Sequence, residues 1–223
     1  MLHLETLIEE FIRTRLRSFE ADTAPDGGTV SVVANKDKDL KRGAREDKVL
    51  AWLKYYKVIL FFPPDRSRAM AGKIIEFADE PRPASLDQCH AQIVREYNRL
   101  KDRIQPLAPP APKSNRPREV TSLTSKALWL CYPHDVPIFD NYALRALQVI
   151  SRICRIYPTP DQELYASFAD VWLQLYDRIR PVIDQSDLQG YQYKMRVLDG
   201  FLWYLGKPEF DVAAASPALV IRN

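Results

Sequence analysis

The chain of 223 residues is 46% hydrophobic and 27% charged, which suits one substantial domain or two helical lobes and excludes a disordered chain. Its formal net charge of +3 is too small to identify a polyanionic partner by itself. Only 7 glycines are present, and neither G-x-G-x-x-G nor G-x-x-x-x-G-K-S/T occurs, so turn-rich β folds and glycine-rich phosphate loops are disfavoured.

The three cysteines, Cys89, Cys131 and Cys154, are widely spaced and form no C-x-x-C pair. We therefore expect no zinc or iron–sulfur site, no other metal and no cofactor. A sparse and odd cysteine count is typical of a reducing compartment. The first residues carry acidic side chains early, unlike a signal peptide, and the longest apolar stretch is too short to span a membrane. We expect a cytoplasmic protein.

Hydrophobic residues at helical spacing predict a first helix over 4–19, which the sequence ADTAPDGGT over 21–29 is expected to end. A second helix is predicted over about 44–60. Its end, KVILFF, could instead form a short buried strand before Pro63 and Pro64, which stop the element.

Asp65 is a predicted N-cap for a helix that ends near residue 80. Ser85 with Gln88 matches a capping box for a helix over about 86–104. The segment PLAPPAPKSNRPRE over 106–119 is proline-rich and basic and cannot be helical throughout. We interpret it as a linker between two lobes.

After this linker, apolar residues predict a helix over about 122–132, and Asp140 occupies the N-cap position of a helix over about 141–156. Two more helices are expected, with start and stop signals at Thr159, Pro160, Gln162, Ser186, Gln189, Gly206 and Pro208. The prediction is a mainly α-helical, two-lobed fold. Its parts are an N-terminal helical lobe 1–105, the linker 106–119, a second lobe 120–207 and a tail 208–223.

The segment TSLTSKALWLCYPHDVPIFDNYALRAL over 121–147 offers the clearest chemistry. It places Lys126 near the start of one short apolar helix and Asp140 at the start of the next. A helix of about seven residues rises roughly 10 Å, and the remaining residues span more than about 20 Å when extended. The loop is therefore long enough to bring Asp140 back beside Lys126.

The order of lysine, short apolar helix, proline-containing loop, P-I-x-D and a helix with R-A-L resembles the core of the helix-hairpin-helix DNA glycosylases. The resemblance is closest to bacterial proteins with the 8-oxoguanine DNA glycosylase fold, whose terminal helix is similar to RVLDGFLWYLGK over 196–207. It covers about 120–207 and implies a glycosylase-like fold with a cleft between the lobes. It places VTSLTSK over 120–126 at the hairpin, Lys126 at the lysine nucleophile and Asp140 at the catalytic aspartate.

The resemblance implies excision of a modified base from DNA, with the base flipped into a pocket. Asp140 would stabilise the positive charge that develops on the sugar, and a buried, neutral amine at Lys126 would attack C1′. The expected substrates are a hypermodified cytosine in phage DNA, such as glucosylated hydroxymethylcytosine, or an oxidised purine. Candidate DNA-binding residues are Ser122, Thr124, Ser125, Arg118, Arg145 and Arg152. Candidate base-pocket residues are Trp52, Tyr55, Tyr56, Trp129, Tyr132 and His134.

Simpler interpretations stay open. Asp140 could act only as an N-cap, Lys126 could be a solvated lysine, and the aromatic residues could belong to the core. Ser122 and Thr124 stand where the family's hairpin has glycines, whose backbone approaches a DNA phosphate closely. Their hydroxyls could donate to the phosphate instead, or the chain could be a non-catalytic DNA-binding or scaffold module.

Overall fold

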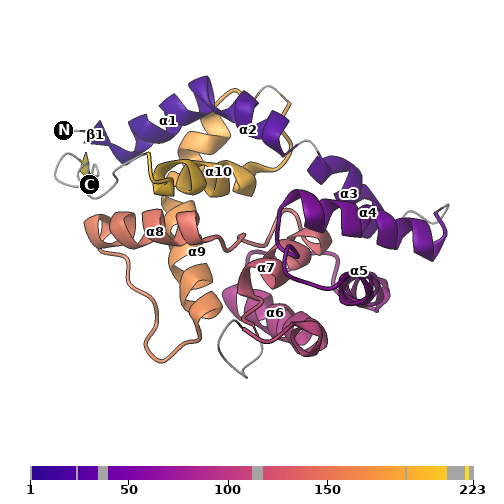
Figure 1. The fold of residues 1–223 in the computed structure, drawn as a ribbon. Helices are drawn as coiled ribbons and strands as arrows, with labels where there is room; N and C mark the ends of the chain where they lie inside the picture. Colours follow the sequence, from indigo (N-terminus) through magenta and orange to yellow (C-terminus); the bar gives the residue numbers. More distant parts are fainter. Residues whose placement is uncertain are drawn as a thin grey trace. The chain divides into compact units, whose positions relative to one another are not determined.

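The computed structural model describes residues 2–23, 25–34, 40–111, 118–188, 190–209 and 219–220 (Figure 1). Over these ranges the chain is mainly α-helical, with ten α-helices, one short 3-10 helix (η1, Gln105–Leu107) and a parallel pairing of β1 (Leu2–His3) with β2 (Leu219–Val220). The mainly α-helical class predicted from hydrophobic periodicity is confirmed. Within the same ranges, no helix combines the length and the apolar character that a membrane crossing requires.

The chain divides into two compact units whose boundaries do not follow the order of the sequence. Unit 1 comprises residues 1–23 and 137–223, and unit 2 comprises the continuous stretch 24–136. The sequence instead suggested a division at the linker 106–119. The first helices of the chain belong with the last ones because their apolar faces pack together, and the helix that carries Lys126 belongs with unit 2.

Unit 1 is organised around its last helix. Its helices are α1 (Leu4–Thr14), α2 (Leu16–Asp22), α8 (Asn141–Cys154), α9 (Leu164–Gln185) and α10 (Lys194–Gly206). Helix α10 contacts each of the other four, and it lies between the α1–α2 pair and α8 (Figure 1). The Phe11 ring of α1 meets the Phe201 ring of α10 edge-on, with centroids 5.9 Å apart. The single helix predicted over 4–19 is interrupted at Arg15.

Unit 2 contains η1 and five α-helices. These are α3 (Pro25–Val33), α4 (Arg42–Tyr55), α5 (Pro64–Asp79), α6 (His90–Ile104) and α7 (Thr121–Cys131). Helix α3 contacts α4 and α7, and α4–α5 and α6–α7 are further packed pairs. The buried Arg45 of α4 donates two hydrogen bonds to the carboxylate of Asp79 on α5, at 3.0 and 2.8 Å. This bidentate pair fixes the relative rotation of α4 and α5.

Several element boundaries differ from those expected. Helix α3 occupies residues that ADTAPDGGT was expected to keep non-helical, and KVILFF forms turns rather than a strand. Helix α5 begins at Pro64 after an N-cap at Pro63, so Asp65 lies inside its first turn. Gln189, expected in the cap of the last helix, lies outside the described residues, and so does most of the tail 208–223.

Candidate active site

Asp140 caps the N-terminus of α8 in unit 1. Its backbone is extended, with φ −145° and ψ 147°, and its Oδ1 accepts a hydrogen bond from the Tyr142 amide at 2.9 Å. The predicted N-cap is therefore confirmed. This hydrogen bond holds the carboxylate in a fixed direction. Because the residue is partly exposed, the carboxylate is also accessible from outside the unit.

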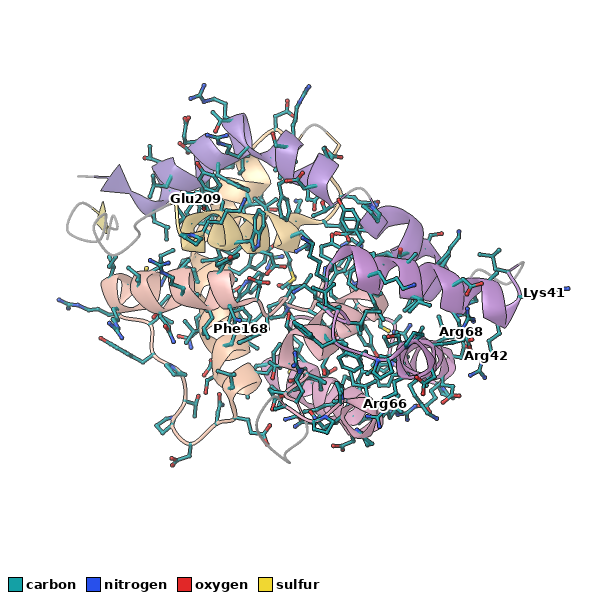
Figure 2. The ribbon with its side chains drawn as sticks, viewed as in Figure 1. Lys41, Arg42, Arg66, Arg68, Phe168 and Glu209 are labelled. Carbon is teal, nitrogen blue, oxygen red and sulfur yellow. The ribbon has the colours of Figure 1, made fainter. Side chains whose placement is uncertain are left out.

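The segment that leads into Asp140 is anchored from α9 and α10. The buried Asp199 of α10 accepts a hydrogen bond from the Ile138 amide at 3.3 Å. The buried Tyr165 of α9 donates its hydroxyl to the Pro137 carbonyl at 3.1 Å. The Phe139 ring meets the Phe168 ring of α9 edge-on, with centroids 5.1 Å apart. Figure 2 labels Phe168. These contacts leave little freedom to the chain just before the carboxylate.

A close backbone approach fixes the first turn of α8 against α10. A Cβ atom on Gly206 would overlap the carbonyl oxygen of Tyr142, so only glycine fits at this position. Beside this contact, the partly exposed Tyr142 ring lies against Trp203 with centroids 6.5 Å apart, and the Lys207 amine sits 3.7 Å from the Trp203 centroid. Asp140 thus opens a helix whose start is rigidly packed and whose surroundings are aromatic and cationic.

Lys126 lies on α7 in unit 2 and is almost fully buried, with 6% of its surface exposed. Its Nζ donates to the Ser122 hydroxyl, one turn earlier on the same helix, at 2.8 Å. Lysines are rarely buried in proteins because removing an ammonium group from water is costly. Every side chain of α7 other than Ser122 is buried, so Lys126 is not the solvated surface lysine of the simpler interpretation.

The residues compared with the family's hairpin are helical here. Residues 121–126 form the first part of α7, so VTSLTSK is not a turn that precedes the helix. Thr124 and Ser125 are fully buried, and their hydroxyls donate to the carbonyls of Val120 and Ser122 at 2.9 and 3.1 Å. A phosphate contact from these two hydroxyls requires exposure that they lack, and Ser122 alone of the three is partly exposed.

Most of the aromatic residues considered for a base pocket are part of the interior of unit 2. Trp52 Nε1 and the Tyr56 hydroxyl donate to the buried Asp26 carboxylate at 2.8 and 2.6 Å. Trp129 is completely buried, and Tyr132 is 1% exposed beneath the Arg82 guanidinium. Three candidates keep some accessible surface, since Tyr55 is 50% exposed, His134 lies at the surface and Tyr56 is partly exposed.

The arginines considered for DNA binding divide between the units. Arg145 and Arg152 are exposed on α8, the helix that Asp140 caps. Arg118 belongs to unit 2, where its guanidinium lies 4.3 Å from the centroid of the exposed Phe61 ring. Lys126 and Asp140 are divided in the same way, so their juxtaposition stays a prediction from the sequence.

Sequence reasoning missed two residues that hold Asp140 and its helix in place. Tyr165 binds the segment before Asp140, and Gly206 allows α10 to pack closely against the first turn of α8. The Asp199 carboxylate of the last helix also binds this segment, through the Ile138 amide. No local pattern marks such contacts, because each joins residues that are distant in the sequence. Comparisons of the chain with family models, with curated proteins and with solved structures gave no match.

Proposed function

We propose that the chain is a DNA glycosylase that removes a modified base and leaves an abasic site. The observation that carries the proposal is the Asp140 carboxylate, which is partly exposed, fixed by the α8 amide and preceded by an anchored segment. Cleavage of an N-glycosidic bond places positive charge on the sugar, and a carboxylate stabilises that charge best when it needs no reorganisation. The buried Lys126 supports the same reading, because a lysine shielded from water is suited to nucleophilic attack.

The chemistry assigns one task to each residue. The bond between C1′ and the base nitrogen breaks, the base leaves with the bonding electrons and takes up a proton, and Asp140 stabilises the remaining oxocarbenium-like sugar. Water or the Lys126 amine then adds at C1′. Addition of the amine gives a Schiff base that eliminates the 3′ phosphate, whereas addition of water gives a simple abasic site.

The substrate we propose is a hypermodified cytosine, such as the glucosylated hydroxymethylcytosine of phage DNA, and an oxidised purine is the second choice. The test is incubation of the protein with DNAs that carry different base modifications, phage DNA included, followed by mass spectrometry of released bases. The wild-type chain should release one class of base.

The matched variant for this test is Asp140→Asn, because asparagine also caps a helix and removes only the charge. We expect base release to fall by roughly a hundredfold or more, with DNA affinity and thermal stability nearly unchanged. Asp177→Asn, at an exposed position on α9, is the control. Full activity of Asp140→Asn on a proven substrate would exclude the mechanism.

Lys126 is tested by borohydride trapping on the same substrate. A covalent adduct should form with the wild-type chain and be absent from Lys126→Gln, whose amide can still donate to Ser122. Lys194→Gln, at an exposed lysine of α10, should trap normally. If base is released but no adduct forms, Lys126 only positions the substrate and the reaction is hydrolytic.

A second candidate function is a non-catalytic DNA-binding or scaffold module. It is favoured by the buried hydroxyls of Thr124 and Ser125, which donate within α7, and by the hydrogen bond from Lys126 to its own helix. In that case the chain binds DNA, no base is released from any substrate, and Asp140→Asn changes neither result.

A further inference from the structure

The turn between α4 and α5 exposes an unusual amount of apolar surface. Among the described residues six large hydrophobic side chains are exposed, and three of them fall within 55–61: Tyr55 at 50%, Leu60 at 64% and Phe61 at 67%. Leu60 and Phe61 are adjacent and stand at the tip of this turn. We call residues 56–62 the α4–α5 tip.

The tip is ordered by its own backbone. Helix α4 ends in a Schellman motif, in which Lys57 adopts φ 54° and the amides of Lys57 and Val58 donate to the carbonyls of Lys54 and Leu53 at 3.0 and 3.2 Å. The Phe62 amide then donates to the Ile59 carbonyl at 3.0 Å. The Ile59 side chain is buried, with 4% exposed, and anchors the turn from beneath. Leu60 and Phe61 are therefore presented outward in a preformed shape, which lowers the entropic cost of binding.

Basic residues flank these two side chains in the sequence, and one more basic side chain contacts Phe61. Exposed Lys54 precedes the tip, exposed Lys57 lies near its start, and Arg66 follows it in the first turn of α5, where Figure 2 labels it. Between residues 54 and 66 the one acidic side chain is Asp65. The Arg118 guanidinium lies over the Phe61 ring itself. An apolar tip with basic residues on both sides of it in the chain and Arg118 against one of its rings is complementary to a polyanion that also has flat apolar surfaces.

We propose that the α4–α5 tip inserts Leu60 and Phe61 between unpaired or unstacked bases of DNA, while Arg118 and the flanking basic residues bind the adjacent phosphates. Base–aromatic stacking contributes about 1–3 kcal/mol per base, and each lysine or arginine near a phosphate adds a salt-dependent contribution. This inference rests on the proposed function only in its choice of DNA as the ligand of the tip. It concerns a surface separate from Asp140 and can be measured without base release.

Nucleic acid fits the tip better than a lipid surface does. A bilayer offers no flat ring face on which Phe61 could stack, and even a whole myristoyl chain, which is more apolar than these two side chains, gives only marginal membrane binding. A protein partner fits less well too, because lysine is depleted from the centres of protein interfaces and here flanks the apolar side chains closely.

The test uses the full chain and fluorescently labelled duplexes that are identical except for one unpaired base. Phe61→Ala and Leu60→Ala should each weaken binding to the duplex with the unpaired base by about tenfold and binding to the paired duplex by much less. Phe61→Trp should retain the wild-type affinity. A 2-aminopurine beside the unpaired base should brighten with the wild-type chain and not with Phe61→Ala.

Tyr157→Ala removes a side chain of similar exposure, 66%, from unit 1 and serves as the matched control. Unchanged binding by Phe61→Ala and Leu60→Ala, or an equal loss with Tyr157→Ala, would overturn the proposal. Binding of the wild-type chain to phosphatidylserine-containing vesicles, lost in Phe61→Ala with DNA binding intact, would assign the tip to a lipid surface. If base release depends on Asp140 but not on Phe61, the glycosylase proposal holds and the proposal for the tip fails.

Discussion

At the scale of single residues, Asp199 links the last helix to the segment before Asp140. It is 3% exposed, forms an ion pair with the buried Arg196 at 3.7 Å, and accepts the Ile138 amide. We expect Asp199→Ala to lower the free energy of unfolding by about 3–5 kcal/mol, because it leaves Arg196 buried without its carboxylate.

Asp199→Asn should cost less, since its amide oxygen can still accept from Ile138. Urea denaturation of both variants measures the difference, and Asp177→Ala, at an exposed position, should unfold like the wild type. If the alanine and asparagine variants were equally stable, the hydrogen bond from the Ile138 amide would not be what holds the segment.

The cysteines give a second prediction at this scale. Burial raises the pKa of the Cys131 and Cys154 thiols to about 11, so neither is a thiolate near neutral pH. A water-soluble disulfide reagent at pH 8 should therefore label only the partly exposed Cys89 until urea unfolds the chain and all three react. Rapid labelling of a second thiol in the native protein would contradict this.

The same burial predicts a loss of stability in base. Above the ordinary thiol pKa of 9.0 the unfolded chain releases these two protons, whereas the folded chain keeps them until about pH 11. The folded state thus binds more protons across this interval, and the free energy of unfolding should fall as the pH rises through it. Urea midpoints measured from pH 8 to pH 11 test the trend, and replacement of both cysteines by alanine should weaken it.

Residues whose role is local could be predicted from the sequence, and those whose role depends on distant contacts could not. Asp140 was recognised as an N-cap because the cap bonds an amide two residues away. Ser85 and Thr159 were misread as caps because their hydroxyls bond distant carboxylates instead, those of Asp135 and Asp170. A capping residue and a tertiary hydrogen bonder look the same in a sequence.

At the scale of elements, the contact of α10 with α8 depends on Gly206. The sequence suggested a stop signal, but this glycine is the last residue of α10 and makes room for the Tyr142 carbonyl. Gly206→Ala should cost roughly 3 kcal/mol through forced separation of the two helices. Gly43→Ala, at a helical glycine with open space around it, should have no such cost, and denaturation of the pair measures the contrast.

The end of α4 gives a prediction of the opposite sign. Lys57 adopts a left-handed conformation, which costs a side-chain-bearing residue roughly 1–2 kcal/mol, and glycine avoids most of that cost. After allowance for the greater freedom of glycine in the unfolded chain, Lys57→Gly should stabilise the protein by about 0.5–1 kcal/mol in urea denaturation. Lys57→Gln, which keeps the strain, should not stabilise it.

Helix α3 shows where periodicity and propensity fail. Two glycines and a proline predicted a break over 21–29, yet Pro25–Val33 is helical. Proline is favourable in a first helical turn, and burial of Val30, Val32 and Val33 against α4 and α7 outweighs the low helix propensity of the glycines. The longer helices were easier to predict because their apolar faces repeat over several turns.

At the scale of the whole molecule, the discontinuous unit 1 makes a truncation informative. Deletion of residues 1–23 removes α1 and α2 and uncovers the apolar surface of α9 and α10 that Leu4, Ile8 and Phe11 cover. We expect unit 1 to unfold while unit 2, which is continuous, keeps its helices. Hydrogen exchange followed by mass spectrometry distinguishes the units, and equal protection of 137–209 in the deleted and full chains would contradict the division. The sequence could not reveal this arrangement, because no local pattern records which distant segments pair.

The discontinuity also orders events on the ribosome. Residues 24–136 emerge as an unbroken stretch and can fold while the rest of the nascent chain is still being made, whereas α1 must wait for α9 and α10, and α2 for α10. Throughout that delay the apolar face of the amphipathic helix α1 stays uncovered. A holdase chaperone that recognises this helix would govern the yield of the protein in the cell.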